Sequence, residues 1–355
     1  MEHNNAKGGI QTFTDTLPRI LGLAGAGEII NAYFVHSSSA KFINRYFTKF
    51  KNLCALFKVL KLAKPDVAIA VEWDPCGYLI EFLKAIFGFK SAAIVHGQEI
   101  YRTGGGYKGR VKRFIRDWTF NRSDAIVAVS TYTAKRLEEE GIKRPMRIIW
   151  NGYDEKKFSN IKRCRDFFED DKIKLVTLSR VVERKGHLYA LKALQILIES
   201  GRDISYDIIG DGGYKKDLEL YVKKNNLENH VNFHGILPDE AIRRIFSYSD
   251  IFIHPNYAAN GGRDFEGFGI VLLEAMSAGL PVMAGRNGGP ADIIKHEDNG
   301  ILVEGQDPIE IADAILRLKN DRVLINSILS KTRKTLSYFS SPEIAKKYEA
   351  LLLCE

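Results

Sequence analysis

Residues 263–285 read RDFEGFGIVLLEAMSAGLPVMAG, and this stretch decides the fold. A Gly-Phe-Gly turn opens an apolar run with a helical pattern, and the short apolar segment LPVMAG follows at 280–285. The longer apolar run is expected to be a helix and the short segment at 280–285 a strand, because strands in proteins are shorter than helices. A turn that opens a helix, followed by a buried strand, is typical of an α/β protein with a parallel sheet.

The same alternation continues on both sides of this stretch. Short apolar segments that we interpret as buried parallel strands lie at 174–180, 205–212, 231–235, 251–256, 280–285 and 301–305 in the second half, and at 29–35, 67–73, 91–97, 125–130 and 147–152 in the first. An irregular charged stretch at 153–172 separates the two series. Two such series predict two doubly wound, Rossmann-like α/β domains facing across a cleft.

The predicted boundaries follow from this series. We expect one Rossmann-like domain over residues 1–160 and a second over residues 161–337. Residues 338–355 contain SPEIAKKYEALLLCE, with Pro342 just inside a predicted helix that begins at Ser341. We expect this final helix to pack back on the first domain.

The composition narrows the class of protein. The chain has 355 residues, of which 45% are hydrophobic and 27% charged, a balance typical of a soluble globular protein with two domains. Its four cysteines, at 54, 76, 164 and 354, form no C-x-x-C pair, which argues against a disulfide framework or a zinc site. The sequence shows neither an apolar run of about 20 residues nor a signal-peptide core. We therefore expect a cytoplasmic protein.

Charge is divided unevenly between the halves. Residues 1–163 hold 27 Lys and Arg against 15 Asp and Glu, which gives +12, whereas residues 164–355 hold 25 against 29, which gives −4. A difference of this size indicates an anionic partner for the first half: a membrane surface, a phosphorylated acceptor or nucleic acid. Residues 40–64 could form a basic amphipathic helix on anionic lipid, or a domain helix with a solvated basic back. The basic cluster at 107–116 follows a glycine run and could be a mobile acceptor loop.

Two glutamates flank the Gly-Phe-Gly turn. Glu266 stands just before it, and Glu274 lies eight positions later, near the face of the helix's first turn. Between them, a helix N-terminus offers free backbone N–H groups and a positive dipole end, which suit a diphosphate. The alternative is that Glu266 is solvated and that Glu274 only caps or pairs.

Two cations follow the first strand of the second series. Arg180 ends that strand, and Lys185 with Gly186 opens the next helix, so both are expected to point into the cleft. Arg and Lys are the usual means of stabilising a departing nucleoside diphosphate without a metal. A solvated basic loop is the alternative. The segment Gly210-Asp211-Gly212 adds a glycine-rich turn between strand and helix, a weak signal in itself.

Together these residues resemble the retaining glycosyltransferases of family 4, which have the GT-B fold. The resemblance covers nearly the whole chain and points to the mannosyltransferase-like branch. The residues that carry it are, in order, Gly8-Gly9, His96-Gly97, S-R-x-x-x-x-K-G at 179–186, G-D-G at 210–212, and E-G-F-G-I-V-L-L-E at 266–274.

The resemblance implies a role for each residue. Arg180 and Lys185 would bind the donor diphosphate, Glu274 the ribose hydroxyls, and Glu266 the hydroxyls of the transferred sugar. His96, otherwise readable as a core or loop histidine, would lie near the transferred sugar and the acceptor, completing a catalytic group with Glu266, Arg180 and Lys185. The remaining donor-binding positions would be Gly9, Gly210, Asp211 and Gly212, with the backbone amides of Phe268, Gly269, Ile270 and Val271.

The resemblance also implies a mechanism. Transfer would retain the anomeric configuration, and the donor phosphate itself would help to take the acceptor's proton. The sequence contains no Asp-x-Asp motif of the kind that binds a metal and no histidine cluster, so we expect no metal or other cofactor. The donor would be a GDP- or UDP-hexose, with GDP-mannose favoured. The acceptor would be a lipid-linked glycan or a polysaccharide of the cell envelope, reached from the inner face of the membrane.

One departure from the family pattern bears on activity. The family's Gly-Gly loop follows an apolar strand, whereas here Gly8-Gly9 is preceded only by MEHNNAK. The first strand of the N-terminal domain is therefore expected to be missing, and a gap in a sheet leaves backbone groups unpaired. This raises the hypothesis of a late recorded start or a truncated chain.

Three rival functions stay open at this point. A non-catalytic or truncated nucleotide-sugar-binding protein could keep the same fold, although the retained Glu266, Glu274, Arg180 and Lys185 argue against it. An epimerase or a phosphorylase of the same architecture fits the two glutamates less well. A nucleic-acid-binding protein would explain the basic half, but the sequence lacks the aromatic and basic recognition motifs of such proteins, so we expect no nucleic-acid partner. The sequence does not define an oligomeric state.

Overall fold

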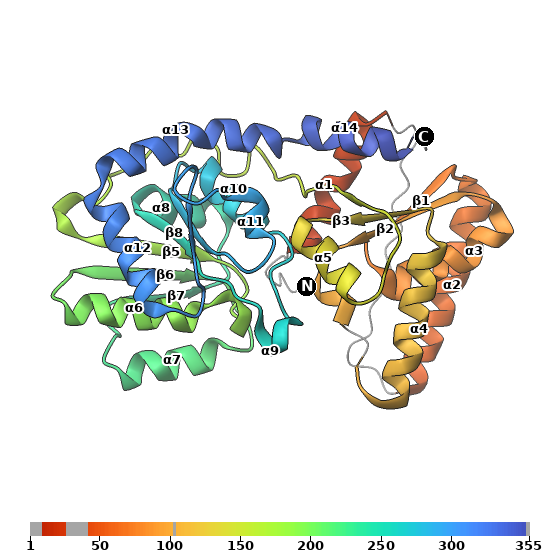
Figure 1. The fold of residues 1–355 in the computed structure, drawn as a ribbon, viewed down its shortest axis with the longest axis horizontal. Coiled ribbons are helices and arrows are strands. Elements are labelled where there is room, and N and C mark those ends of the chain that lie inside the picture. The colour runs from red at the N-terminus through yellow and green to blue at the C-terminus, as the bar shows by residue number, and fades with distance from the viewer. Residues whose placement is uncertain (1–8, 26–41, 102–103, 353–355) are drawn as a thin grey trace. The chain divides into compact units, whose positions relative to one another are not determined.

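The computed structural model describes residues 9–25, 42–101 and 104–352 (Figure 1). The predicted strand at 29–35, and Gly8, lie outside these residues. The chain divides into two compact units. One contains Trp150–Ile344 and residues 9–16, and the other contains Leu17–Ile149 and residues from Ala345 onward. The divisions fall inside the first and last helices, α1 (Gly9–Leu23) and α14 (Ser341–Leu352), so each unit is described by itself.

The unit around Leu17–Ile149 has a parallel sheet in the order β1-β2-β3-β4. Its described strands are β1 (Val67–Ala70), β2 (Lys90–Val95), β3 (Ala125–Ala128) and β4 (Met146–Ile148), and its helices include α2 (Phe42–Ala63), α3 (Tyr78–Phe87), α4 (Gly106–Arg122) and α5 (Thr131–Glu139). The strands predicted at 67–73, 91–97, 125–130 and 147–152 are confirmed. β2 is buried over five consecutive residues, as expected of a central parallel strand.

The two basic segments of this unit are both helical. In the described part of α2, Leu56 and Leu60 are buried while Lys58 and Lys61 are exposed, so this part has a buried face and a basic back. The mobile loop predicted at 107–116 is wrong, because these residues form the N-terminal part of α4. The glycine run ends at the first residue of that helix rather than extending as a loop. None of the described helices is long and apolar enough to cross a bilayer.

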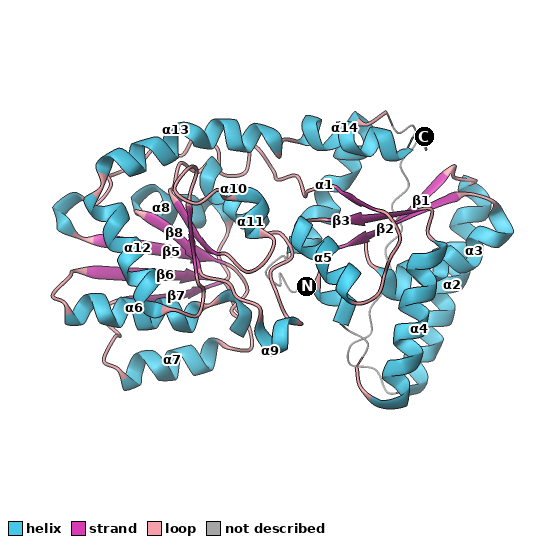
Figure 2. Cartoon of the chain, viewed as in Figure 1, coloured by secondary structure: helices cyan, strands magenta, loops and turns pink. Residues whose placement is uncertain are grey.

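The unit around Trp150–Ile344 contains a six-stranded parallel sheet in the order β10-β9-β8-β5-β6-β7 (Figure 2). Its strands are β5 (Ile173–Leu178), β6 (Ile204–Ile209), β7 (Val231–Gly235), β8 (Ile251–His254), β9 (Val282–Gly285) and β10 (Ile301–Val303), so all six predicted strands are confirmed. The order reverses between β5 and β8. Open α/β sheets bind ligands at such a reversal, outside the carboxyl ends of the strands.

Helices connect these strands and supply the core. They are α6 (His187–Glu199), α7 (Lys215–Lys224), α8 (Asp239–Tyr248), α9 (Ala259–Gly262), α10 (Ile270–Ser277), α11 (Pro290–Ile293), α12 (Pro308–Asn320) and α13 (Arg322–Tyr338). α6 and α12 pack on each other and form one core cluster with β5 and β6, whereas α10 contacts β8, β9, α11 and α13. β8 and β9 are buried throughout, which explains their unbroken apolar sequences.

Candidate active site

The candidate site lies at the carboxyl edge of the six-stranded sheet, where the strand order reverses. β5 ends at Leu178 and β8 at His254, and these two strands are neighbours. The loop after β5 contains the 3-10 turn Glu183–Lys185, and the loop after β8 leads to Glu266. Residues 69 to 82 positions apart in sequence therefore meet at one edge.

Glu266 is the centre of the site. Its Oε2 accepts a hydrogen bond from the Lys185 ammonium and a second from Arg184 Nη1 at 2.7 Å. His254 Nε2 lies 3.4 Å from the same oxygen and 3.4 Å from Lys185 Nζ. Arg184 also pairs with Asp264, its Nε lying 3.1 Å from the carboxylate. One carboxylate oxygen is thus shared by two cations and a histidine.

Burial and charge act against each other on these groups. Burial by itself would raise the pKa of Glu266, but the charges of Lys185 and Arg184 outweigh it and hold that pKa well below its usual value. Burial lowers the pKa of Lys185 to about 8, against the attraction of Glu266. Burial also lowers the pKa of His254 to about 4, so its ring is neutral at pH 7. At neutral pH the cluster therefore contains two cations, one anion at its centre and an uncharged imidazole.

Arg184 and His254 were not among the predicted site residues. The sequence contained a signal for each: Arg184 precedes Lys185 directly in the segment E-R-K-G, and His254 ends the apolar segment IFIH. Both side chains are buried. Ligands bind outside the carboxyl ends of parallel strands, so a search for cations and histidines at those ends would have identified Arg184 and His254.

Arg180 lies differently from Lys185. It is exposed on the loop that follows β5, and its charge acts on Lys185. The structure therefore brings Lys185 and Glu266 together and places Arg180 at the solvent side of the same loop. Lys185, in contrast, is buried and held by Glu266. The assigned roles stay predictions.

The second glutamate, Glu274, lies one turn into α10 and is buried. Lys157 Nζ is 3.4 Å from its Oε1, and Lys157 also lies 3.5 Å from Asp239. Burial raises the pKa of Glu274, although Lys157 opposes the effect. Lys157 belongs to the charged stretch between the two predicted series, where no sequence signal distinguished it from its neighbours.

The Gly-Phe-Gly turn opens α10 as predicted. Gly269 stands before the helix with φ +94°, and Ile270 and Val271 form its first turn. Amide groups in a first turn have no acceptor within the helix, so they are available to an anion. Phe268 is buried, with its ring 5.7 Å from that of Phe339, which anchors the turn to the end of α13.

The segment Gly210-Asp211-Gly212 follows β6 and packs against the loop after β5. A Cβ on Gly210 would lie 1.9 Å from the Ser179 carbonyl oxygen, and one on Gly212 would lie 2.2 Å from that of Val181. Asp211 is exposed, and its carboxylate accepts from the Gly212 amide at 2.8 Å. The two glycines therefore allow the segment after β6 to approach closely the loop after β5, which holds the cations.

The remaining predicted residues are His96 and Gly9. His96 follows β2 in the other unit, is buried, and has its pKa lowered to about 3 by that burial, so it is neutral. Its backbone N–H donates to the Glu99 carboxylate. Gly9 is the first residue of α1. Their proposed proximity to the donor stays a prediction.

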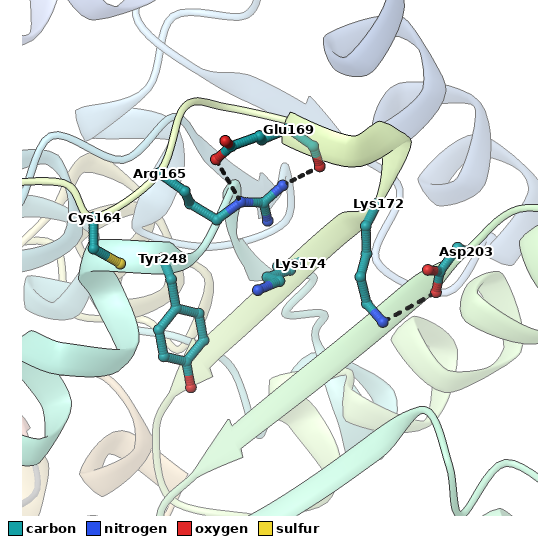
Figure 3. Close-up of a pocket in the computed structure, with 7 residues that line it drawn as sticks. All are labelled: Cys164, Arg165, Glu169, Lys172, Lys174, Asp203 and Tyr248. Atoms are coloured by element: carbon teal, nitrogen blue, oxygen red, sulfur yellow. Dashed lines mark hydrogen bonds and ion pairs between the residues drawn. The ribbon is translucent and has the colours of Figure 1, made fainter.

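A separate pocket of about 440 Å³ opens at the opposite edge of the six-stranded sheet, near the amino ends of β5 and β6 (Figure 3). It is lined by Cys164, Arg165, Glu169, Lys172, Lys174, Asp203 and Tyr248. Two of its cations already face carboxylates, Lys172 with Asp203 at 3.2 Å and Arg165 with Glu169 at 3.8 Å. Because ligands of such sheets bind at the carboxyl edge, we place the site at Glu266 and not here.

Side chains that could bind a metal do not gather in the described part of the chain. Within residues 9–25, 42–101 and 104–352, no group of three or more His, Cys, Asp and Glu side chains is placed to hold an ion. The prediction that the reaction needs no metal is a statement about activity, and it stays a prediction.

Comparison with protein families gives two matches that together cover most of the chain. The model described as "Glycosyl transferases group 1" matches residues 160–338, which is half of the chain. The model described as "Glycosyltransferase Family 4" matches residues 18–157. The first match contains the whole of the candidate site around Glu266.

Curated relatives are 24% to 29% identical to this chain over the aligned residues. The amylovoran biosynthesis glycosyltransferase of Erwinia amylovora is 27% identical over 76% of this chain and 65% of its own length. A GDP-mannose-dependent phosphatidylinositol monomannoside mannosyltransferase of Mycobacterium tuberculosis is 29% identical over 65% of this chain and 60% of its own. The chain thus spans less than two thirds of these relatives. A putative colanic acid biosynthesis glycosyltransferase of Escherichia coli is 24% identical over 88% and 76%.

Solved structures share the fold at low sequence identity. Sucrose-phosphate synthase of Thermosynechococcus elongatus matches with a TM-score of 0.78 and 19% identity, covering 98% of this chain and 93% of its own. The Anabaena protein HepE, in complex with UDP and glucose, matches with a TM-score of 0.68 and 20% identity, covering 85% and 81%. The two α/β units thus have the architecture of these proteins.

Proposed function

The chain belongs to the group 1 glycosyl transferases, and from this membership we propose that it moves a hexose from a nucleoside diphosphate sugar to a glycan acceptor. The sugar would be of the mannose or glucose type, carried on GDP or UDP. The acceptor would be lipid-linked or a polysaccharide in cell-envelope assembly. The glycan-assembly activities for which the Erwinia amylovora, Mycobacterium tuberculosis and Escherichia coli relatives are named support this assignment.

The observation that carries the proposal is the charge arrangement around Glu266. A departing nucleoside diphosphate needs cations, and at the carboxyl edge of the sheet Lys185 and Arg184 both pair with Glu266, the residue directly before the turn that opens α10. The Lys185 ammonium has three hydrogen-bond donors. Glu266 engages one of them and His254 faces a second at 3.4 Å, which leaves one donor for a phosphate oxygen. Exposed Arg180 would close on the same anion from the solvent side.

In this proposal the two glutamates have different tasks. Glu266 is held ionised by its cations, so it would accept hydrogen bonds from hydroxyls of the transferred sugar while keeping Lys185 in place. Glu274 would accept from the ribose hydroxyls, for which either of its protonation states has acceptor capacity. His96 is neutral and would contact the transferred sugar and the acceptor. Reaction with retention of configuration and without a metal completes the proposal, with positioning and electrostatic stabilisation as the protein's contributions.

The test is a donor panel. The purified protein is incubated with GDP- and UDP-hexoses, with and without a membrane lipid extract, and released nucleotide is measured alongside the anomeric configuration of the product. Lys185→Ala is expected to lower turnover at least about 100-fold, the usual size of an electrostatic contribution in a closed site. Lys224→Ala, an exposed lysine at the end of α7, is the matched control and should leave turnover unchanged.

The outcomes separate the alternatives. Acceptor-dependent turnover of one donor, insensitive to EDTA and lost in Lys185→Ala, supports the proposal in full. Nucleotide binding by calorimetry without turnover of any donor would instead favour a non-catalytic nucleotide-sugar-binding protein. An inverted product would refute the retaining mechanism. We further propose a cytoplasmic protein that is peripheral at the inner face of the membrane.

A further inference from the structure

Helix α4 presents an apolar stripe to solvent. Tyr107, Val111 and Phe114 are 80%, 40% and 71% exposed, and they lie four and three positions apart, on one face of the helix. Trp118 continues the stripe one turn later, with the Arg122 guanidinium 5.5 Å from the centre of its ring. A helix on a globular protein normally turns its apolar stripe toward the core. Here the stripe faces outward.

The packing of α4 fixes this orientation. The face opposite the stripe carries Gly109, Arg116, Thr119 and Phe120, all of them buried. The Arg116 guanidinium donates to the Ile100 carbonyl at 2.8 Å and pairs with Glu140 at 3.0 Å and Asp117 at 2.8 Å. α4 also packs on α3. Rotating the stripe inward would break these contacts, so its exposure is a stable property of the unit.

The unpaired charges beside the stripe are positive, because the one acidic residue of α4, Asp117, pairs with Arg116 at 2.8 Å. Lys108, Arg110 and Arg113 are exposed on α4, and residues 104–116 contain no acidic residue. Lys112 differs from the others because it pairs with Asp74, 3.3 Å away. The outer surface of α4 therefore combines exposed aromatic rings with a border of unpaired charge of one sign.

We propose that this outer face of α4 is a membrane-docking surface that inserts Tyr107, Val111 and Phe114 into an anionic bilayer. Amphipathic helices lie in the bilayer interface with their apolar side chains among the acyl chains and their basic residues at anionic headgroups. Tyr and Trp are suited to this depth, because their rings are apolar and their polar atoms reach water. A protein partner would need acidic residues around an apolar pocket, whereas an anionic bilayer supplies both features at once.

The position of α4 links this surface to the chemistry. α4 follows β2 and the loop that begins at His96, so the helix starts at the carboxyl edge of its sheet. Docking would hold that edge at the membrane surface, where a lipid-linked acceptor is found. This link rests on the proposed function, whereas the docking surface itself does not.

The test measures binding of the full chain to vesicles. Cosedimentation with 3:1 phosphatidylcholine:phosphatidylglycerol vesicles compares the wild type with Y107S/V111S/F114S, whose altered side chains are exposed and outside the core. We expect the partition coefficient to fall at least about tenfold in the triple variant. The control is I309S/V323S/Y338S, which alters three exposed apolar side chains of the other unit, 64%, 80% and 52% exposed. It should bind like the wild type.

Two further readouts identify the surface and its lipid. Binding should weaken in 0.5 M salt and on pure phosphatidylcholine, because the basic border is screened or has no anion to meet. Trp118 fluorescence should be quenched by brominated lipid in the wild type and not in the triple variant, with Trp118→Phe identifying the signal. Circular dichroism checks that all variants are folded.

Several results would overturn the proposal. These are equal vesicle binding by the wild type and the triple variant, no binding of the wild type at low salt, or a dimer in solution that only the stripe substitutions dissociate. A second assay, the turnover of a sugar donor with a lipid-free acceptor, distinguishes failure of the docking surface from failure of the proposed transferase function. If the triple variant keeps that turnover but loses vesicle binding, both ideas stand. If no donor is turned over but stripe-dependent binding is found, only the transferase assignment fails.

Discussion

Replacing Glu266 by Gln should show how strongly the stability of this unit depends on the carboxylate that faces the buried cations. The substitution keeps the shape of the side chain but removes the anion that faces Lys185 and Arg184. Arg184 keeps Asp264 as a partner, 3.1 Å away, whereas Lys185 is left as a buried cation beside a histidine. Removing one partner of a buried ion pair lowers the free energy of unfolding by about 3 to 5 kcal/mol. We expect a loss in that range for this unit at pH 7.

The pH dependence of this loss follows from Lys185. Burial already lowers its pKa from 10.5 to about 8 with Glu266 present, and without the carboxylate the pKa falls further. The unfolded state then binds more protons than the folded state between that lowered value and 10.5. Stability of the variant should therefore rise with pH in this window, by up to about 1.4 kcal/mol per unit for one proton. The double variant Lys185→Met/Glu266→Gln has no ammonium group at this position, so its stability should lack this pH dependence and the comparison isolates the contribution of Lys185.

Hydrogen exchange of peptides from β5 and β8 is the suitable assay, because it reports opening of this unit alone. The wild type, Glu266→Gln and the double variant are compared at pH 6, 7.5 and 9, with rates corrected for intrinsic exchange. The double variant should recover much of the lost stability, since removing both charges leaves no unpaired ion. A loss below about 1 kcal/mol for Glu266→Gln, or a double variant less stable than the single one, would refute the reasoning.

Two other substitutions test the same unit. Glu274→Gln should raise the free energy of unfolding at pH 7, by about 1 kcal/mol, while weakening nucleotide binding, because burial raises the pKa of Glu274 and makes its ionised form unfavourable in the fold. In the wild type, the folded state therefore binds more protons than the unfolded state above pH 4.5, and the stability gained by the Gln variant should vanish near pH 4, where Glu274 is protonated in both states. Urea unfolding of the wild type and the variant at pH 7 and pH 4 checks the sign. A gain that is the same at both pH values would contradict the reasoning. Gly186→Ala should destabilise the unit by about 3 kcal/mol or more, because φ is +75° and a Cβ would lie 1.8 Å from the Pro255 carbonyl oxygen. Gly201→Ala, with φ +80° and open space around it, is the control and should lose only about 1 kcal/mol; equal losses in thermal unfolding would show that the contact with Pro255 is not decisive.

Much of the fold could be predicted because it depends on local patterns. Ten predicted strands are present, each a short apolar run bounded by turn residues, and the alternation with helices implied parallel pairing. Glu266 and the turn before α10 could be located for the same reason, since a Gly-Phe-Gly turn opening a helix is a local feature. The strand predicted at 29–35 lies outside the described residues. The segment 107–116 is helical although a glycine run precedes it, because that run ends at the first residue of α4.

The sequence by itself determined the family, the two α/β series, and the positions of Glu266, Glu274 and Lys185, because these depend on periodicity and on motifs of fixed spacing. Only the tertiary structure decided which side chains meet. Arg184 faces Glu266 while Arg180 is exposed, and Lys157 faces Glu274, although each of these cations looks alike in the sequence. The direction of a side chain in a loop depends on the backbone angles of that loop and on what packs against it, as Gly186 packs on Pro255. Such contacts join residues about 70 to 120 positions apart, and no local pattern encodes them.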